Sequence, residues 1–180
     1  ALYYIDQCEE GGDKMSMQEQ LSLFVSVARD EIGVTETREN YVKYGDWYGV
    51  NGQPWCAMFV SWCAEQAGIL TTETKSDCPY VPRMSYTPYI QEWYLRNRRL
   101  LEPNLALGNP NYPILGDILL IDSSGGQAVN HVGIVADNNG TEWTVIEGNC
   151  GNMVKAVRYT DLVSASGAKI LYLCSNHTHY

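Results

Sequence analysis

Basic residues are scarce in this sequence, and histidine is scarcer still. The 180 residues include 12 lysines and arginines against 21 aspartates and glutamates, which gives a formal net charge of -9. Phosphate backbones repel such a chain, so the charge balance argues against nucleic acid as a partner. No apolar run approaches the roughly 20 residues of a membrane span, and no basic segment followed by an apolar run marks a signal peptide. We therefore expect a mature or excised domain.

Metal-binding spacing is also missing. None of the 6 cysteines forms a CxxC pair, so we expect no structural zinc site, and nothing in the chain calls for an organic cofactor. Cys63 follows Cys56 by two turns of an apolar helix, which predicts a buried free thiol. The remaining four lie near loops or the chain ends, where disulfides are common: Cys8, Cys78, Cys150 and Cys174. They allow three pairings, of which we favour Cys8–Cys174. This cysteine usage favours an extracellular compartment.

The apolar pattern changes period halfway along the chain. Ser16 and Glu19 form a capping box that predicts a helix ending at Gly33. Its apolar face would carry Leu21, Phe24, Val25, Ala28 and Ile32. Further helices are expected over about 54–67 and 87–99, and short strands over 114–121, 131–136, 141–146, 154–159 and 170–173. Helices followed by strands predict an α+β fold, with N-terminal helices packed on a C-terminal antiparallel β-sheet.

This pattern also predicts the domain organisation. Hydrophobic residues make up 45% of the chain, enough for one well-packed core. We expect residues 1–15 to form a linker or N-terminal arm, residues 16–175 a single domain and residues 176–180 a C-terminal tail. Two of the 3 histidines fall in that tail, so His131 is the only histidine within the folded pattern.

Cys56 lies where a long aromatic loop, 34–53, meets the second predicted helix. Pro54 suits the first helical position because its missing N–H would have no partner there. A thiol in the first turn of a helix faces unpaired N–H groups, which favour the nucleophilic thiolate. The competing interpretation is a small buried apolar residue, as cysteines usually are.

The loop itself has two interpretations. It is either a segment packed by its own aromatic residues or a substrate wall beside the nucleophile. Flat amphipathic rings suit contacts with sugars and peptides. The candidate substrate-binding residues are Tyr44, Trp47, Tyr48, Gln53 and Trp55.

The hairpin turn at 138–140 predicts which group faces the histidine. Counting outward from a three-residue loop sets His131 directly opposite Glu147, with Cβ atoms about 5 Å apart. A carboxylate there would fix the imidazole tautomer and leave the other ring nitrogen toward sulfur. Asn149 would lie on the same face if the strand continues. The alternative is an ordinary cross-strand polar pair, and a slip of one residue would move Glu147 to the other face.

These segments resemble those of CHAP domains, the cysteine, histidine-dependent amidohydrolases/peptidases. The matching segments, in the family's order, are KYGDWYG at 43–49, PWCAMFVSWC at 54–63, GDI at 116–118, HVGIV at 131–135 and IEGN at 146–149. The resemblance covers about residues 17–174, although the segment 71–113 matches no motif. It implies a papain-like version of the α+β fold.

The resemblance also implies a reaction, the hydrolysis of an amide bond in bacterial peptidoglycan. Cys56 would be the nucleophile, His131 the general base and then acid, Glu147 the group that orients His131, and Asn149 an assisting residue. The intermediate would be a thioester acyl-enzyme. The bond would be that of an N-acetylmuramoyl-L-alanine amidase or of a stem or crossbridge endopeptidase.

Three alternatives remain open at this point. The first is the related NlpC/P60 type of cell-wall endopeptidase. The second is a non-catalytic module of the same fold that binds cell wall or glycan, and the third is a secreted effector with an amide substrate outside the wall. Under the leading hypothesis, we expect a secreted or cell-wall-associated protein of bacterial or phage-like origin. We expect it to be a monomer, alone or within a longer multidomain protein.

Overall fold

The computed structural model describes residues 14–74 and 77–177. The helices are α1 (Met17–Asp30), α2 (Lys43–Tyr48), α3 (Cys56–Gln66) and α4 (Thr87–Arg96), with a 3₁₀ helix η1 (Pro103–Ala106). The strands are β1 (Leu70–Thr71), β2 (Val81–Pro82), β3 (Leu100–Leu101), β4 (Ile118–Asp122), β5 (His131–Asn138), β6 (Glu142–Glu147), β7 (Lys155–Thr160), β8 (Val163–Ser164) and β9 (Lys169–Cys174).

Six antiparallel strands close into a barrel, which corrects the predicted fold class. They follow one another in the order β9-β4-β5-β6-β7-β8, and β8 pairs again with β9. The prediction of a papain-like fold with helices packed on an open sheet is therefore wrong. Closure depends on Val163 of β8, which pairs with Thr160 on one side and Lys169 on the other. A strand of two residues has no recognisable sequence period, so the sequence pattern did not reveal it.

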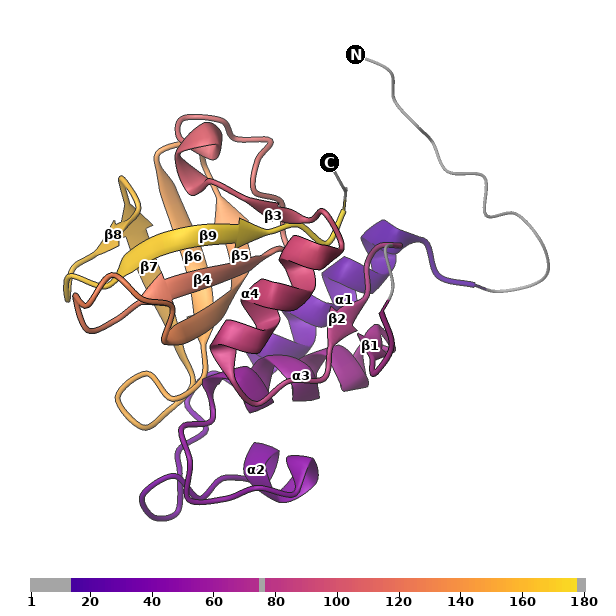
Figure 1. Cartoon of the computed structure of the whole chain (residues 1–180), viewed down its shortest axis with the longest axis vertical. Helices are drawn as coiled ribbons and strands as arrows, with labels where there is room; N and C mark the ends of the chain where they lie inside the picture. Colours follow the sequence, from indigo (N-terminus) through magenta and orange to yellow (C-terminus); the bar gives the residue numbers. More distant parts are fainter. Residues whose placement is uncertain (1–13, 75–76, 178–180) are drawn as a thin grey trace.

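Closure divides the apolar residues between two cores. Leu119, Ile121 and Val135 belong to the cluster inside the barrel, whereas Ile118 and Leu120 belong to the cluster against the helices. Both faces of β4 are thus covered, which explains its uninterrupted apolar run. In Figure 1 the barrel lies on one side of the molecule and α1, α3 and α4 lie on the other, with α2 below them.

The predicted helices are present with altered ends. The capping box of Ser16 and Glu19 is confirmed at the start of α1. Ile32 lies beyond this helix and is exposed, so its predicted place on the apolar face is wrong. Pro54 lies before α3 rather than in its first position. The predicted loop 34–53 contains α2, whose six residues are too few for a helical period to be recognisable.

The cysteines and the C-terminal residues agree with the predictions only in part. Cys63 is a fully buried free thiol, as predicted. Among the residues described, Cys78, Cys150 and Cys174 are also free, so no disulfide joins them, and Cys8 lies with the predicted arm outside the described range. Asn176, expected in a tail, is fully buried, and its backbone N–H donates to Asp117 Oδ1 at 2.8 Å.

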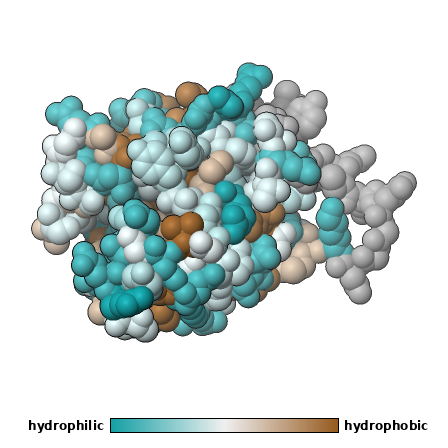
Figure 2. All heavy atoms as spheres, turned by 60° about the horizontal axis from the view of Figure 1, so that its bottom comes forward, coloured by the Kyte–Doolittle hydropathy of each residue, from teal (hydrophilic) through white to brown (hydrophobic). Residues whose placement is uncertain are grey.

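The face shown in Figure 2 is largely hydrophilic. Figure 2 shows apolar atoms on one face as small separate groups among polar atoms. Scattered apolar residues of this kind are normal on a folded domain. Within 14–74 and 77–177, every helix is too short or too polar to cross a bilayer.

Candidate active site

The first turn of α3 carries the candidate nucleophile. Cys56 is the first residue of the helix and is 5% exposed. Trp55 is the N-cap residue, and no side chain caps this end. The first intrahelical hydrogen bond runs from the Phe59 N–H to the Trp55 carbonyl at 2.9 Å. The N–H of Cys56 therefore has no partner within the helix and is available to bind an anionic oxygen.

Two of the predicted substrate-binding aromatics instead hold this helix start in place. Tyr44 and Trp55 are both 0% exposed, with ring centroids 5.5 Å apart. The Trp55 indole donates to Glu36 at 2.9 Å, and the Tyr44 hydroxyl donates to Glu31 at 2.5 Å. These two rings are core residues and cannot contact a substrate, which corrects the predicted set.

The other three predicted contact residues remain accessible. Trp47 and Tyr48 are partly exposed and Gln53 is exposed. Arg83 lies over the Tyr48 ring at 4.0 Å from its centroid and donates to the Tyr48 carbonyl at 2.9 Å. This contact brings the segment that matched no motif beside the aromatic loop.

The same segment is tied to α3 and to the chain just before β5. The Ser61 hydroxyl donates to the Met84 carbonyl at 2.9 Å and accepts from the Met84 N–H at 3.0 Å. The Thr87 hydroxyl lies 3.5 Å from the carbonyl of Val129, two residues before His131. The segment thus lies against both elements that carry the candidate catalytic residues.

His131 and Glu147 are in contact, as predicted, although the predicted register is wrong. Nε2 of His131 lies 2.8 Å from Oε2 of Glu147. The ladder pairs Ile134 with Ile146, so the residue aligned with Glu147 is Gly133 rather than His131. The register differs by two residues because the hairpin loop is displaced and a bulge follows Val135. Two residues is the period of a strand, so Glu147 remains on the same face as His131.

Electrostatics join this pair to the candidate nucleophile. His131 is 8% exposed, and burial by itself lowers its pKa. Hydrogen bonds and charge from Cys56 and Glu147 outweigh burial and raise the pKa to about 10. Since Nε2 faces Glu147, the other ring nitrogen, Nδ1, is left for Cys56. A pKa raised in this way favours the protonated imidazole at neutral pH.

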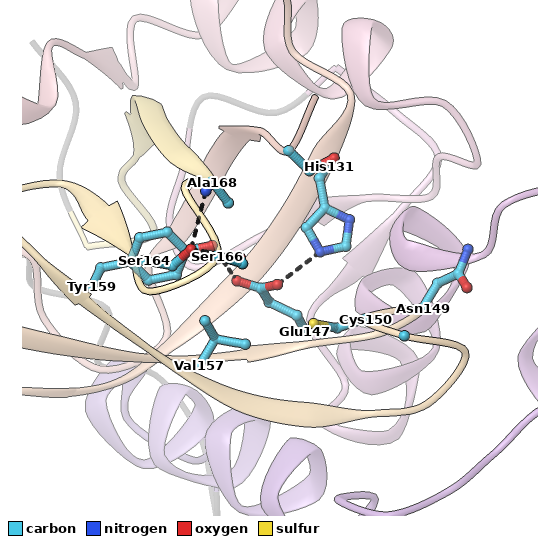
Figure 3. Close-up of a pocket in the computed structure, with 11 residues that line it drawn as sticks. His131, Glu147, Asn149, Cys150, Val157, Tyr159, Ser164, Ser166 and Ala168 are labelled. Atoms are coloured by element: carbon cyan, nitrogen blue, oxygen red, sulfur yellow. Dashed lines mark hydrogen bonds and ion pairs between the residues drawn. The ribbon is translucent and has the colours of Figure 1, made fainter. Parts of the chain in front are cut away.

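Two further residues, which the sequence analysis did not assign to the site, lie beside Glu147. The Tyr159 hydroxyl donates to Oε1 at 2.6 Å, and the Cys150 thiol lies close enough for the charge of Glu147 to affect its pKa. Burial and the charge of Glu147 raise the pKa of the Cys150 thiol. Figure 3 shows these groups converging on Glu147 at a cavity of about 230 Å³. No sequence spacing links Tyr159 or Cys150 to His131.

Asn149 lies apart from this arrangement. Strand β6 ends at Glu147, and Asn149 occupies the following turn with a left-handed backbone, φ 54°. It borders the same cavity (Figure 3), but in the described chain no hydrogen bond joins its side chain to His131. The condition for placing Asn149 on the face of Glu147, that the strand continues through it, is not met.

A helix-borne thiol, a strand-borne imidazole and a carboxylate on the next strand are the groups that thiol-dependent hydrolases use. Comparison with known families agrees with that class. The family model described as CHAP domain matches residues 47–149, more than half of the chain, and the chain belongs to this family. CHAP domains are generally hydrolases of peptidoglycan and occur in cell-wall-acting proteins. No match was found among curated proteins or among solved structures.

Proposed function

We propose that this chain hydrolyses an amide bond of peptidoglycan through Cys56, His131 and Glu147. The observation that carries the proposal is the buried imidazole, which is hydrogen-bonded to Glu147 at 2.8 Å and has its pKa raised by Cys56 as well as by Glu147. Cys56 and Glu147 raise the pKa of the imidazole to about 10, and we propose that the pair reacts as thiolate and imidazolium. That form supplies both a nucleophile and a proton donor before substrate binds.

In the first half of the reaction, the Cys56 thiolate attacks the amide carbonyl carbon, and a C–S bond forms. The developing oxyanion is stabilised by the unpaired N–H of Cys56 at the start of α3. His131 gives its proton to the amide nitrogen, the C–N bond breaks, and the amine leaves. The result is a thioester acyl-enzyme with a neutral imidazole.

In the second half, water attacks the thioester carbonyl. His131 takes a proton from that water, the C–S bond breaks, and the acid product leaves with the thiolate restored. Glu147 keeps the imidazole in one orientation through both halves. Among the described residues no hydrogen bond joins Asn149 to His131, so we give it no part in orienting the ring.

Trp47, Tyr48 and Gln53 form the accessible wall that we assign to substrate binding. Two partly exposed rings offer flat apolar faces with polar edges, which suits both the sugars and the peptides of the wall polymer. Arg83 stacks on one of these rings and adds a fixed positive charge. Stem peptides carry carboxylates, which this charge would attract.

A module that only binds cell wall has no use for the charged groups at the barrel end. His131 and Glu147 are both nearly fully buried, and burying ionised groups costs free energy even when they are paired. Catalysis gives a reason for this cost, because perturbed titratable groups concentrate at functional sites. The same catalytic groups would serve an NlpC/P60-type endopeptidase. The two types of enzyme are therefore distinguished by the bond that they cut and not by these residues.

The test is digestion of purified peptidoglycan by the wild-type chain, by Cys56→Ala and by Cys63→Ala, with mass spectrometry of the soluble fragments. Cys63 is a matched control, because it is a buried free cysteine of the same helix. We expect fragments from the wild type and Cys63→Ala but not from Cys56→Ala. A new alanine amino terminus together with a free lactyl carboxylate on muramic acid would indicate an amidase. New termini within the peptide would indicate an endopeptidase.

Equal fragment release by Cys56→Ala would contradict the assigned nucleophile. No release from several wall types by folded, reduced wild-type chain would contradict the hydrolase itself.

Because CHAP domains occur in cell-wall-acting proteins that are often secreted, we propose a secreted or wall-associated location for this chain as well. Fractionation of the source cells would test that location.

A further inference from the structure

Glu147 is held from both of its carboxylate oxygens. Oε2 lies 2.8 Å from His131 Nε2, and Oε1 accepts the Tyr159 hydroxyl at 2.6 Å. Glu147 is 2% exposed and Tyr159 is 1% exposed, so bulk water does not compete for either contact. Tyr159 lies 12 residues after Glu147 and comes from a different strand, β7.

The contact between Tyr159 and Glu147 is not an ordinary cross-strand pair. The ladder between β6 and β7 aligns Glu147 with Lys155 and aligns Tyr159 with Trp143. The phenol therefore reaches along the inside of the barrel to meet the carboxylate. Tyr159 also pairs with Ser164 of β8, the strand that closes the barrel. Barrel closure thus sets where this hydroxyl lies.

We propose that Tyr159 is a positioning residue, which holds the Glu147 carboxylate in the orientation that contacts His131. The inference rests on the proposed function, because it assigns Tyr159 a part in the same reaction. A carboxylate on a flexible side chain with one free oxygen can rotate away from its partner. A second donor on the other oxygen removes that freedom, and groups that orient a catalytic side chain in this way have large effects on activity.

The ionisation state of Tyr159 suits this role. Burial first, and then the charge of Glu147, raise the pKa of the phenol above its ordinary value. The hydroxyl therefore keeps its proton at neutral pH and donates to the carboxylate. The Cys150 thiol is another side chain whose pKa responds to Glu147. A thiol is a weak donor, so it does not replace the phenol.

The experiment compares Tyr159→Phe, Glu147→Ala and the double variant. Phenylalanine keeps the ring that packs inside the barrel and removes only the hydroxyl. We expect Tyr159→Phe to lower kcat by roughly 10-fold or more with little change in KM, as for other groups that orient a reacting side chain. In the Glu147→Ala background the same change should lower kcat by less than about 2-fold, because it acts through Glu147.

A second measurement does not depend on catalysis. The His131 ring is followed by NMR across pH, and the rate of Cys56 alkylation is followed in the same samples. In Tyr159→Phe we expect the pKa of His131 to fall from about 10, since the carboxylate that raises it is no longer held in place. Tyr94→Phe is the matched control, because this buried phenol donates to Asn176 at 2.6 Å, outside the site.

Three outcomes would overturn the inference: unchanged titration of His131 in Tyr159→Phe, an equal shift in Tyr94→Phe, or equal effects of Tyr159→Phe with and without Glu147. The proposed function fails separately. If the wild type releases no wall fragments but the His131 pKa still falls in Tyr159→Phe, the positioning role stands and the substrate assignment does not.

Discussion

Gly133 faces Glu147 across the β5–β6 pair, and the absence of a side chain there lets Glu147 reach His131. A Cβ atom placed on Gly133 would lie 2.9 Å from Cγ of Glu147. That distance is well inside van der Waals contact, so one of the two residues would have to move. The same Cβ would lie closer still to Cγ1 of Val145, so the glycine in the HVGIV segment is required by the close approach of both β6 side chains.

Gly133→Ala tests this requirement. We expect a loss of stability of about 1–3 kcal/mol, as for overpacked cores, together with at least a roughly 10-fold loss of activity because Glu147 is displaced. Urea unfolding and wall digestion measure the two effects. Gly126→Ala is the control, since its added Cβ would meet only the Ser124 hydroxyl at 3.5 Å. Equal activity of both variants would contradict the steric argument.

The charge on His131 makes stability depend on pH. Its pKa is about 10 in the folded chain and about 6.5 when unfolded. The folded state binds this proton more tightly, so the stabilisation is complete below pH about 6.5 and is lost as pH rises toward 10. We expect the urea midpoint of the wild type to fall over this range more steeply than that of His131→Gln. Parallel curves for the two proteins would show that the ring is not charged in the folded state.

Asp122 organises the loop that leads into His131. Its carboxylate accepts the N–H groups of Ser124 at 2.9 Å, Gly125 at 2.9 Å and Gln127 at 2.7 Å. The backbone hydrogen bond from Ser124 is the main cause that lowers the pKa of Asp122 to about 2. The stabilising carboxylate is thus present above pH about 4 and is lost as pH falls toward 2.

Asp122→Ala should loosen this loop and lower activity by roughly 10-fold, because the loop positions His131. Amide hydrogen exchange over residues 123–130 should rise at neutral pH in the variant, and in the wild type only on acidification toward pH 2. Asp30→Ala removes an exposed carboxylate at the end of α1 and serves as control. Unchanged exchange in Asp122→Ala would exclude the proposed role of this carboxylate.

Trp47 of the aromatic loop and Trp55, which follows it, should have different effects when each is replaced by alanine. Trp55 is fully buried, so Trp55→Ala should cost about 3–5 kcal/mol of stability. Trp47 is partly exposed, so Trp47→Ala should cost less than about 1 kcal/mol. It should raise KM by about 10-fold through lost substrate contact, equivalent to about 1.4 kcal/mol. Thermal unfolding and kinetics on soluble wall fragments distinguish the two effects, and an unchanged KM in Trp47→Ala would remove this ring from the substrate wall.

Local patterns predicted the parts of this protein that depend on neighbouring residues. The capping box of Ser16 and Glu19 begins α1 as expected, since both partners lie within one turn. The apolar run after Cys56 predicted α3 with its cysteine in the first turn. The contact of His131 with Glu147 was predicted although the register was wrong, because the error was two residues and a strand has a period of two.

The remaining features depended on contacts between distant segments. The two-residue strand β8 forms only because β7 and β9 are already beside it, and this pairing turns the expected open sheet into a barrel. The bulge after Val135 lies where Arg29 of α1 donates to the Ala136 carbonyl at 2.6 Å, more than a hundred residues away. Neither feature leaves a periodic trace in the sequence.

The sequence by itself thus determined the chemistry: a thiol at a helix start, an imidazole on a strand, and a carboxylate within reach of it. The tertiary structure alone decided which aromatic rings are buried, how the barrel closes, and that Tyr159 binds the second oxygen of Glu147. The physical reason is range. Helix caps and strand alternation arise from residues a few positions apart, whereas closure and burial depend on every segment that packs against the site.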